Sequence, residues 1–298
     1  MDMGKITARN RIRGQKIRPY IYIMPAIVFL LLFTVYPILR QGYLSFFNTD
    51  ALISFMEYTG LRHYRDMVSN PVFREVVKNT LVYGILQVSL TLVLGLGCAL
   101  IANSKLNRFG SLFKVSMFYP YILPWAVAAM VWMYIFHPTR GIVNALSGRR
   151  IQWLNDFHLT LYVLVFISVW KTVGFNFLLF LSGLQSIPQV LYEAIRLETN
   201  SWFKAFRYVT LPMISPTAFA AVLLSIVGSF QSVDLIYIVT QGRPGNSTNV
   251  LIYYIYQQGI TNWNIGYGSA LSSVLFIALL FFTIIYIVLG EKKVQYDR

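Results

Sequence analysis

Long apolar segments alternate with short polar segments along this chain. Six of the apolar segments hold about 20 or more residues, the length that an α-helix needs to cross the hydrocarbon core of a bilayer. They lie near residues 20–39, 81–102, 112–136, 159–184, 217–240 and 267–290. The pattern predicts an all-α membrane protein with six transmembrane helices, following a basic segment over residues 1–19.

The composition excludes an ordinary soluble domain. The 298 residues are 56% hydrophobic and only 12% charged, whereas about a quarter of the residues in a soluble domain carry a charge. In a soluble protein, the net charge of +14 would suggest nucleic acid as a partner. In a membrane protein, basic residues collect on the cytoplasmic side, close to anionic lipid. We therefore expect no binding to nucleic acid.

Basic residues also predict the orientation in the membrane. Residues 1–19 are rich in Lys and Arg, and six spans place both termini on one side. The positive-inside rule favours the cytoplasm for that side, which also receives the charged segment over residues 185–216. The apolar segment 20–39 is longer than the core of a signal peptide, roughly 7–15 residues, and no A-x-A cleavage site follows it. We interpret it as an uncleaved first span.

The charged segment between the fourth and fifth spans is longer than a simple connection requires. Charged and apolar side chains alternate from Leu191 to Pro216. This alternation predicts one short helix, a turn at residues 199–201 and a second helix that Pro212 stops. The apolar side chains of such a pair need a partner, either another protein or the inner membrane surface.

The same segment resembles the E-A-A loop of permease subunits from binding-protein-dependent ABC importers. The family pattern runs roughly E-A-A-x-x-D-G-A and ends in L-P-x-x-x-P. Glu193 and Ala194 match its opening, and residues 211–216 match its end. The preceding run from Trp170 to Ala194 resembles the sugar-importing branch of these permeases.

Glu198 stands where the family usually has Asp. Two positions depart from the family pattern, because Ile195 replaces the second Ala and Thr199 replaces a Gly. Glycine normally permits a positive φ between the two helices of this loop. The resemblance implies that the loop docks on an ATP-binding subunit and couples ATP hydrolysis to movement of the spans. The residues that this role would involve are Glu193, Ala194, Leu197, Glu198, Thr199, Phe203, Phe206 and Pro212.

The resemblance implies the rest of the assembly as well. Residues 20–298 would form a MetI-like transmembrane domain of the maltose type, as a multi-pass protein of the bacterial inner membrane with both termini in the cytoplasm. Its partners would be a second homologous permease, two ATP-binding subunits that hold ATP and Mg, and an extracytoplasmic solute-binding protein. We rank oligosaccharides, including uronate-containing ones, first among substrates, and glycerol-3-phosphate or its diesters second. No cofactor or metal is expected on this chain.

Polar residues inside the spans are candidates for the substrate pathway, because a polar group is costly to bury in a membrane. The amides of Asn176 and Gln231 both donate and accept hydrogen bonds, which suits sugar hydroxyls. The alternative to a pathway role for Lys171 is structural: its amine snorkels to the membrane surface or forms an interhelical bond. Asp234 lies at a similar depth and could pair with it. Two aromatic side chains that can stack on sugar rings complete the set, Trp170 and Tyr237.

Pro120 and Pro124 lie within the third expected span. A proline removes a backbone donor, so the sequence predicts a kinked or interrupted helix there. A hinge that pivots during transport and a static kink are equally compatible with this pattern.

Enzymatic motifs are absent from the sequence. No G-x-x-x-x-G-K-[ST] phosphate loop occurs, and the three histidines have no metal-ligand spacing. We expect a non-enzymatic subunit whose partners hydrolyse ATP. One rival is an ion-coupled secondary transporter, which would need inverted repeats and paired acidic residues in its spans. The sequence shows only Asp234. A membrane subunit with a purely structural role is a second rival.

Overall fold

The computed structural model describes residue 20 and residues 22–49, 55–104, 110–230 and 233–290. Four described helices are long and apolar enough to cross a membrane: Tyr22–Leu44, Pro71–Asn103, Thr160–Gln185 and Ile265–Gly290. Two helix pairs also qualify if each bent pair is one span: Gly110–Ile122 with Trp125–Ile135, bent by 101°, and Trp202–Met213 with Ser215–Ser229, bent by 69°. The described part thus holds four spans, or six with both bent pairs.

The first span ends in a small compact region at one end of the molecule. Its helix includes a π turn, η1 (Leu31–Val35), and continues as α2 (Tyr36–Leu44). Strands β1 (Phe47–Thr49) and β2 (Met56–Tyr58) then pair antiparallel. The short helix α3 (Arg62–Ser69) leads into α4 (Pro71–Asn103).

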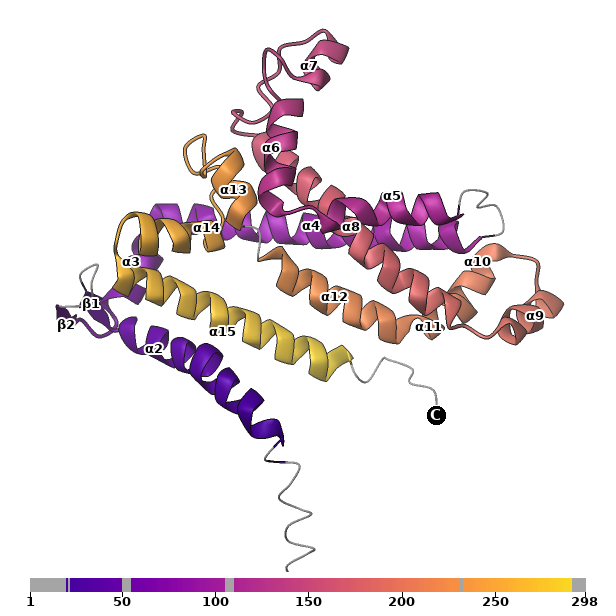
Figure 1. Ribbon diagram of the computed structural model, residues 1–298, viewed down its shortest axis with the longest axis horizontal. Coiled ribbons are helices and arrows are strands. Elements are labelled where there is room, and N and C mark those ends of the chain that lie inside the picture. The colour runs from indigo at the N-terminus through magenta and orange to yellow at the C-terminus, as the bar shows by residue number, and fades with distance from the viewer. Residues whose placement is uncertain (1–19, 21, 50–54, 105–109, 231–232, 291–298) are drawn as a thin grey trace, which may run out of the picture.

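Helix α4 starts where its sequence provides a cap. The side chain of Asn70 accepts a hydrogen bond from Val72 N at 2.9 Å, and Pro71 occupies the first turn, where its missing N–H costs nothing. Because this cap precedes the apolar segment, α4 begins well before residue 81, where hydropathy alone placed the start of the second span. Helix α4 packs extensively along α8 (Thr160–Gln185), and the pair lies at the centre of Figure 1.

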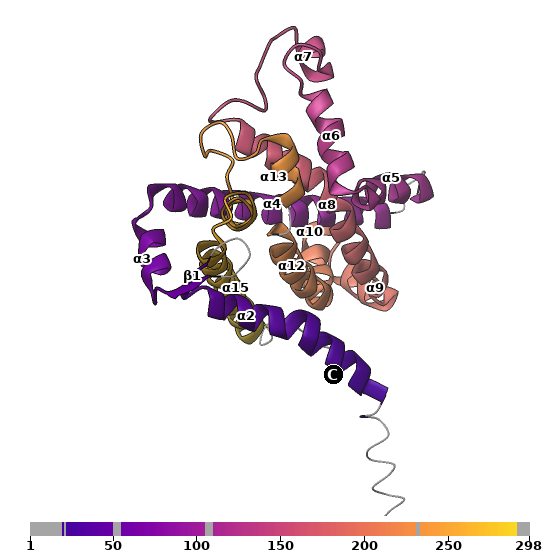
Figure 2. The ribbon, with the colours of Figure 1, turned by 60° about the vertical axis from the view of Figure 1, so that its left-hand side comes forward.

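The third span consists of α5 (Gly110–Ile122) and α6 (Trp125–Ile135). The interruption expected from the prolines is present, because Pro124 is the residue that precedes α6. Beyond the bend, α6 leads to the short helix α7 (Ile142–Ser147). Helix α6 packs against α8 and against a later helix at residues 233–239, while Figures 1 and 2 both show α7 projecting beyond the other helices.

The fifth expected span is not one continuous helix. Helix α12 (Ser215–Ser229) ends before the next described helix, α13 (Val233–Val239), which packs against α6. The division coincides with the most polar part of this segment, which holds Ser229, Gln231 and Asp234. The chain continues through α14 (Leu251–Tyr256) and a π turn, η3 (Gln257–Thr261), into the last span, α15 (Ile265–Gly290).

The two ends of the molecule carry different structures. The hairpin, α3 and the start of α15 gather at one end of Figure 1. At the opposite end lie α9 (Gln189–Glu198), α10 (Trp202–Ala205), the π turn η2 (Phe206–Thr210) and α11 (Leu211–Met213).

Candidate functional site

The segment that links α8 to α12 forms two helices joined by a tight turn. Helix α9 ends because Thr199 is extended, with φ −160° and ψ 140°. The hydroxyl of Thr199 accepts a hydrogen bond from Ser201 N at 3.2 Å, and Ser201 in turn caps α10 by accepting from Lys204 N at 3.5 Å. Any residue adopts an extended backbone, so the turn does not need the glycine that the family usually has at position 199.

The second helix ends one residue beyond Pro212, the residue at which the sequence pattern predicted its stop. The helix runs from α10 through η2 into α11, and its last residue is Met213. In η2 the N–H of Leu211 bonds to the carbonyl of Phe206, one residue further back than in an α-helix. This shift in the bonding pattern lets the helix pass the proline. The chain then bends at Ile214, whose φ is −85° and ψ is 2°.

One face of α9 is turned outward. Val190, Glu193, Ala194 and Leu197 lie at positions i, i+3, i+4 and i+7, which places them on one side of a helix, and all four are exposed. The side chain of Leu197 is 91% exposed. An apolar side chain at this exposure gains stability only when a partner covers it.

The opposite face of α9 is anchored to the rest of the segment. The hydroxyls of Tyr192 and Thr210 are 3.0 Å apart and form a hydrogen bond between α9 and η2. A cavity of about 730 Å³ lies between the two helices and the end of α4, with Tyr192, Ile195 and Asn103 in its wall. The hydrogen bond between Tyr192 and Thr210 therefore fixes α9 against the second helix, with its exposed face outward.

Helix α10 also carries exposed aromatic side chains. Trp202 and Phe203 are both about two-thirds exposed, and the ring of Trp202 stacks on that of Phe206 at 5.4 Å. Among the described residues, the one ion pair within 4 Å joins Arg62 and Asp66 at the other end of the molecule. The exposed charges of the segment are thus free to meet a partner: Glu193, Arg196, Glu198, Lys204 and Arg207.

Lys171 does not face an open pathway. Its side chain is 4% exposed, and its ammonium donates to the carbonyls of Leu123 at 2.5 Å and Tyr121 at 3.0 Å, in the break between α5 and α6. It makes no ion pair with Asp234 within the described part of the chain. Asp234 is exposed near the start of α13. The interhelical alternative considered for Lys171 is the arrangement that the structure contains.

The other pathway candidates lie in separate places. Asn176 is 2% exposed and accepts a hydrogen bond from the hydroxyl of Ser225 on α12 at 3.1 Å. Trp170 packs edge-on against Trp132 of α6. Tyr237 is partly exposed and lies among the tyrosines of α14. Gln231 lies outside the described residues. The described candidates thus contact different partners, and their role in a substrate pathway stays a prediction.

A polar seam between α4 and α8 was missed by the sequence reasoning. Tyr83 bonds to Ser168, and both Gln87 and Thr91 bond to the hydroxyl of Thr172, at 3.3 Å and 3.2 Å. The sequence does contain a signal for this seam, because polar residues recur at every fourth position along both apolar segments. Interhelical hydrogen bonds of this kind fix the register of two spans in a membrane.

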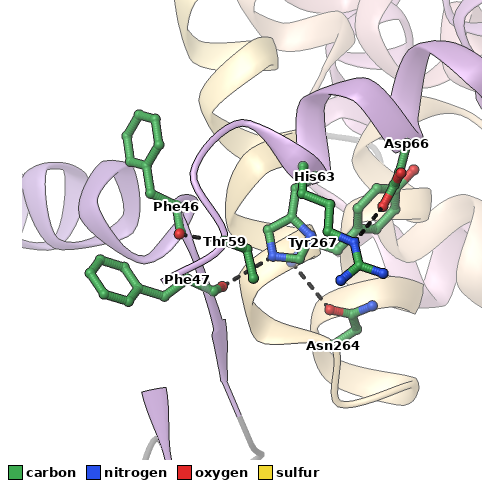
Figure 3. A network of polar contacts seen from close by, with 8 residues as sticks. Phe46, Phe47, Thr59, His63, Asp66, Asn264 and Tyr267 are labelled. Atoms are coloured by element: carbon green, nitrogen blue, oxygen red, sulfur yellow. Dashed lines mark hydrogen bonds and ion pairs between the residues drawn. The ribbon is translucent and has the colours of Figure 1, made fainter. Parts of the chain in front are cut away.

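The opposite end of the molecule holds a polar pocket of about 420 Å³. Figure 3 shows part of its wall. The ring of His63 lies 3.1 Å, through Nε2, from the carbonyl of Phe47, and Asn264 accepts from Tyr267 N at 3.2 Å. The first contact joins α3 to β1, and the second lies at the start of α15. The ring of His63 also packs edge-on against that of Tyr267, with 6.1 Å between the ring centres, and so links α3 to α15. Spacing in the sequence did not indicate this role for His63.

Comparison with known proteins identifies the family. Residues 91–293 match the family described as binding-protein-dependent transport system inner membrane component. This chain belongs to that family. The sulfoquinovosyl glycerol transport system permease protein SmoG of Agrobacterium fabrum is 32% identical to it, over 94% of this chain and 92% of SmoG. The sn-glycerol-3-phosphate transport system permease protein UgpA of Brucella abortus is 31% identical, over 99% of this chain and 100% of UgpA.

The fold agrees with this membership. A chain in the crystal structure of a bacterial ABC transporter involved in the import of the acidic polysaccharide alginate superimposes with a TM-score of 0.79, at 19% sequence identity, covering 94% of this chain and 98% of the other. The protein is thus an inner-membrane permease component with the MetI-like fold. Family membership rules out the ion-coupled secondary transporter considered from the sequence.

Proposed function

We propose that this permease imports a carbohydrate across the inner membrane. The proposal is supported by its relatives, since SmoG is named for a sulfoquinovosyl glycerol and the structural neighbour serves the import of alginate. An oligosaccharide, including one that contains uronate, is the substrate class we favour. UgpA supports glycerol-3-phosphate or its diesters as the second candidate, because its identity to this chain is nearly the same.

The segment over residues 185–216 couples transport to ATP hydrolysis on separate subunits. The observation that carries this proposal is the outward face of α9. Its four exposed positions repeat at i, i+3, i+4 and i+7, the spacing with which a helix lies in the groove of a partner. The neighbouring Trp202 and Phe203 extend the apolar contact, and the unpaired charges form its rim.

The remaining parts of the assembly follow from this docking. Two ATP-binding subunits hold ATP and Mg, a second permease completes the pathway, and a solute-binding protein delivers substrate on the outer side. Both termini and the helix pair α9–α10 then lie in the cytoplasm. The polar pocket around His63 and the projecting helix α7 lie towards the outside.

The test replaces side chains on the outward face in the complete transporter. The complex with its ATP-binding subunits and second permease is reconstituted in nanodiscs, and ATPase activity is measured as loaded binding protein is added. Burial of a leucine stabilises a contact by about 2 kcal/mol, so Leu197→Ala should weaken ATPase docking about thirtyfold. Glu193→Ala should also reduce the stimulation by binding protein.

Gln189→Ala is the matched control. Gln189 is exposed on the same helix but lies to the side of the outward face, so its loss should leave stimulation unchanged. Equal effects of Leu197→Ala and Gln189→Ala would contradict docking through this face. Failure of any ATPase to associate, together with uptake that follows an ion gradient, would overturn the importer itself.

A further inference from the structure

The bend in the third span exposes backbone carbonyls in the middle of an apolar segment. Helix α5 ends at Ile122, and its last carbonyls have no donor in the next turn. In a continuous helix, residue 124 would donate to the carbonyl of Pro120, but Pro124 has no N–H. A carbonyl left without a donor in a bilayer is costly, because no water is present to replace the bond. The break therefore requires a donor from elsewhere.

Lys171 supplies that donor from α8. Its ammonium lies 2.5 Å from the carbonyl oxygen of Leu123, 3.0 Å from that of Tyr121 and 3.5 Å from that of Pro120. An ammonium group has three donors and no acceptor, so it matches three carbonyls that have lost their own partners. No neutral side chain of similar length provides three donors at one point.

The positive charge is compensated without a carboxylate. The ammonium lies 4.9 Å from the centre of the Trp125 ring, and aromatic faces attract cations. It also lies at the carboxyl end of α5, where the helix dipole is negative. The described residues include no acidic partner within 4 Å of it. The ring of Trp125 and the carbonyls of the break thus interact favourably with the ammonium, and the ammonium bonds the break in return.

This contact lies at the junction between α5, which is held against α8, and α6, which packs against α13 and carries α7. Next to Lys171 on α8, the backbones of α8 and α5 touch directly, because a Cβ on Gly174 would lie 2.2 Å from the carbonyl oxygen of Met117. Helix α5 is therefore held against α8. Beyond the bend, α6 leads to α7, which projects from the spans in Figures 1 and 2. The angle at the bend decides where α7 lies.

We propose that Lys171 is a positioning residue of this permease, which holds the angle between α5 and α6 by bonding the free carbonyls of the break. During transport, the ammonium exchanges carbonyl partners as α6 and α7 change their angle to α8. The first statement concerns the structure alone, and only the second rests on the proposed transport function.

Spin labels measure the angle directly in the complete transporter. With Cys98 replaced by Ala, labels are placed at Leu146 on α7, which is 85% exposed, and at Ser186, at the end of α8. The distance distribution between them should be narrow in the parent protein and clearly broader or shifted in Lys171→Met. Lys171→Arg, which keeps the charge and the donors, should restore part of the parent distribution. Uptake should fall about tenfold or more in Lys171→Met.

Thr172→Val provides the matched control. Thr172 is the next residue on α8 and bonds to Gln87 and Thr91, away from the break, so its loss should leave the distribution between the labels unchanged. If Lys171→Met does not assemble, Trp125→Leu removes the aromatic contact and should broaden the same distribution. A parent-like distribution in Lys171→Met, or in Trp125→Leu if that variant must be used, would overturn the proposal. An altered distribution without any uptake in the parent would contradict only the transport function.

Discussion

The third span and the entry to the fifth are both bent, but their backbones are satisfied in different ways. At the 101° bend between α5 and α6, the donor is the ammonium of Lys171, about 50 residues further along the chain. At the 69° bend before α12, the donors are local. Ile214 N bonds to the carbonyl of Thr210 at 3.0 Å, and Ala218 N bonds to that of Ile214 at 2.8 Å.

The difference indicates how each bend behaves when the molecule moves. A bend that bonds to itself keeps its angle when neighbouring helices shift, so the helix pair α9–α10 can transmit a force to α12. At the other bend, α6 also packs against α13 and α8, but one distant side chain bonds the free carbonyls of the break, so the angle can change when that side chain changes partners. The first bend is suited to movement and the second to transmission.

The largest effect is expected where both bends meet α8. Gly174→Ala places a methyl group 2.2 Å from a backbone oxygen of α5, which cannot rotate away. Gly183→Ala places one 2.6 Å from the hydroxyl oxygen of Thr217, whose side chain can turn. We expect a loss of about 3 kcal/mol or more for Gly174→Ala and about 1 kcal/mol for Gly183→Ala.

Thermal unfolding of the purified complexes measures both losses. Gly97→Ala serves as the control, because a Cβ on Gly97 meets nothing within 4 Å. If Gly183→Ala were as damaging as Gly174→Ala, the first bend would have no special dependence on α8.

A smaller effect on uptake is expected when the proline at each bend is replaced, and it should differ between the two bends. Pro124→Ala restores an N–H that can bond to the carbonyl of Pro120 and so favours a straighter third span. Uptake should fall about tenfold, equivalent to about 1.4 kcal/mol in the barrier. Pro212→Ala should change uptake by less than about twofold, because η2 already carries the helix past this position. Similar losses of uptake in the two variants would show that the bends are equivalent.

The smallest expected effect is a pH-dependent change in stability at the start of α8, the helix that both bends contact. The carboxylate of Asp156 accepts hydrogen bonds from the N–H groups of His158 and Leu159, at 2.8 Å and 2.9 Å. These bonds hold the pKa of Asp156 below its usual range. Because the folded pKa is the lower one, the stabilisation is present at neutral pH and is lost as the pH falls through that value.

Melting temperatures test this dependence on pH. The wild-type complex should melt slightly above Asp156→Ala at pH 7, and the difference should disappear at acidic pH as the carboxylate is protonated. Neither bend contacts Asp156, so the distances between labels on α7 and α8 should stay the same. A difference that persisted in acid would mean that the carboxylate charge has no role there.

Much of the structure of the segment over residues 185–216 was predictable from the sequence. The alternation after Leu191 predicted two helices with a turn at residues 199–201, and the helical spacing of Glu193, Ala194 and Leu197 determines that they share a face. Such local features depend on residues close together in the chain. The stop expected at Pro212 is confirmed to within one residue, because the helix passes through a π-helical turn and ends at Met213.

The sequence by itself determined that this chain is a helical membrane protein, where most spans lie and that the third one breaks near Pro124. These properties follow from hydropathy and from the missing N–H of proline, which act within a few residues. Only the tertiary structure decided that Lys171 bonds across to the break, that Asn176 meets Ser225 and that α12 and α13 separate. Each of these depends on which spans become neighbours, and a buried polar group takes whichever partner the packing brings within hydrogen-bond distance.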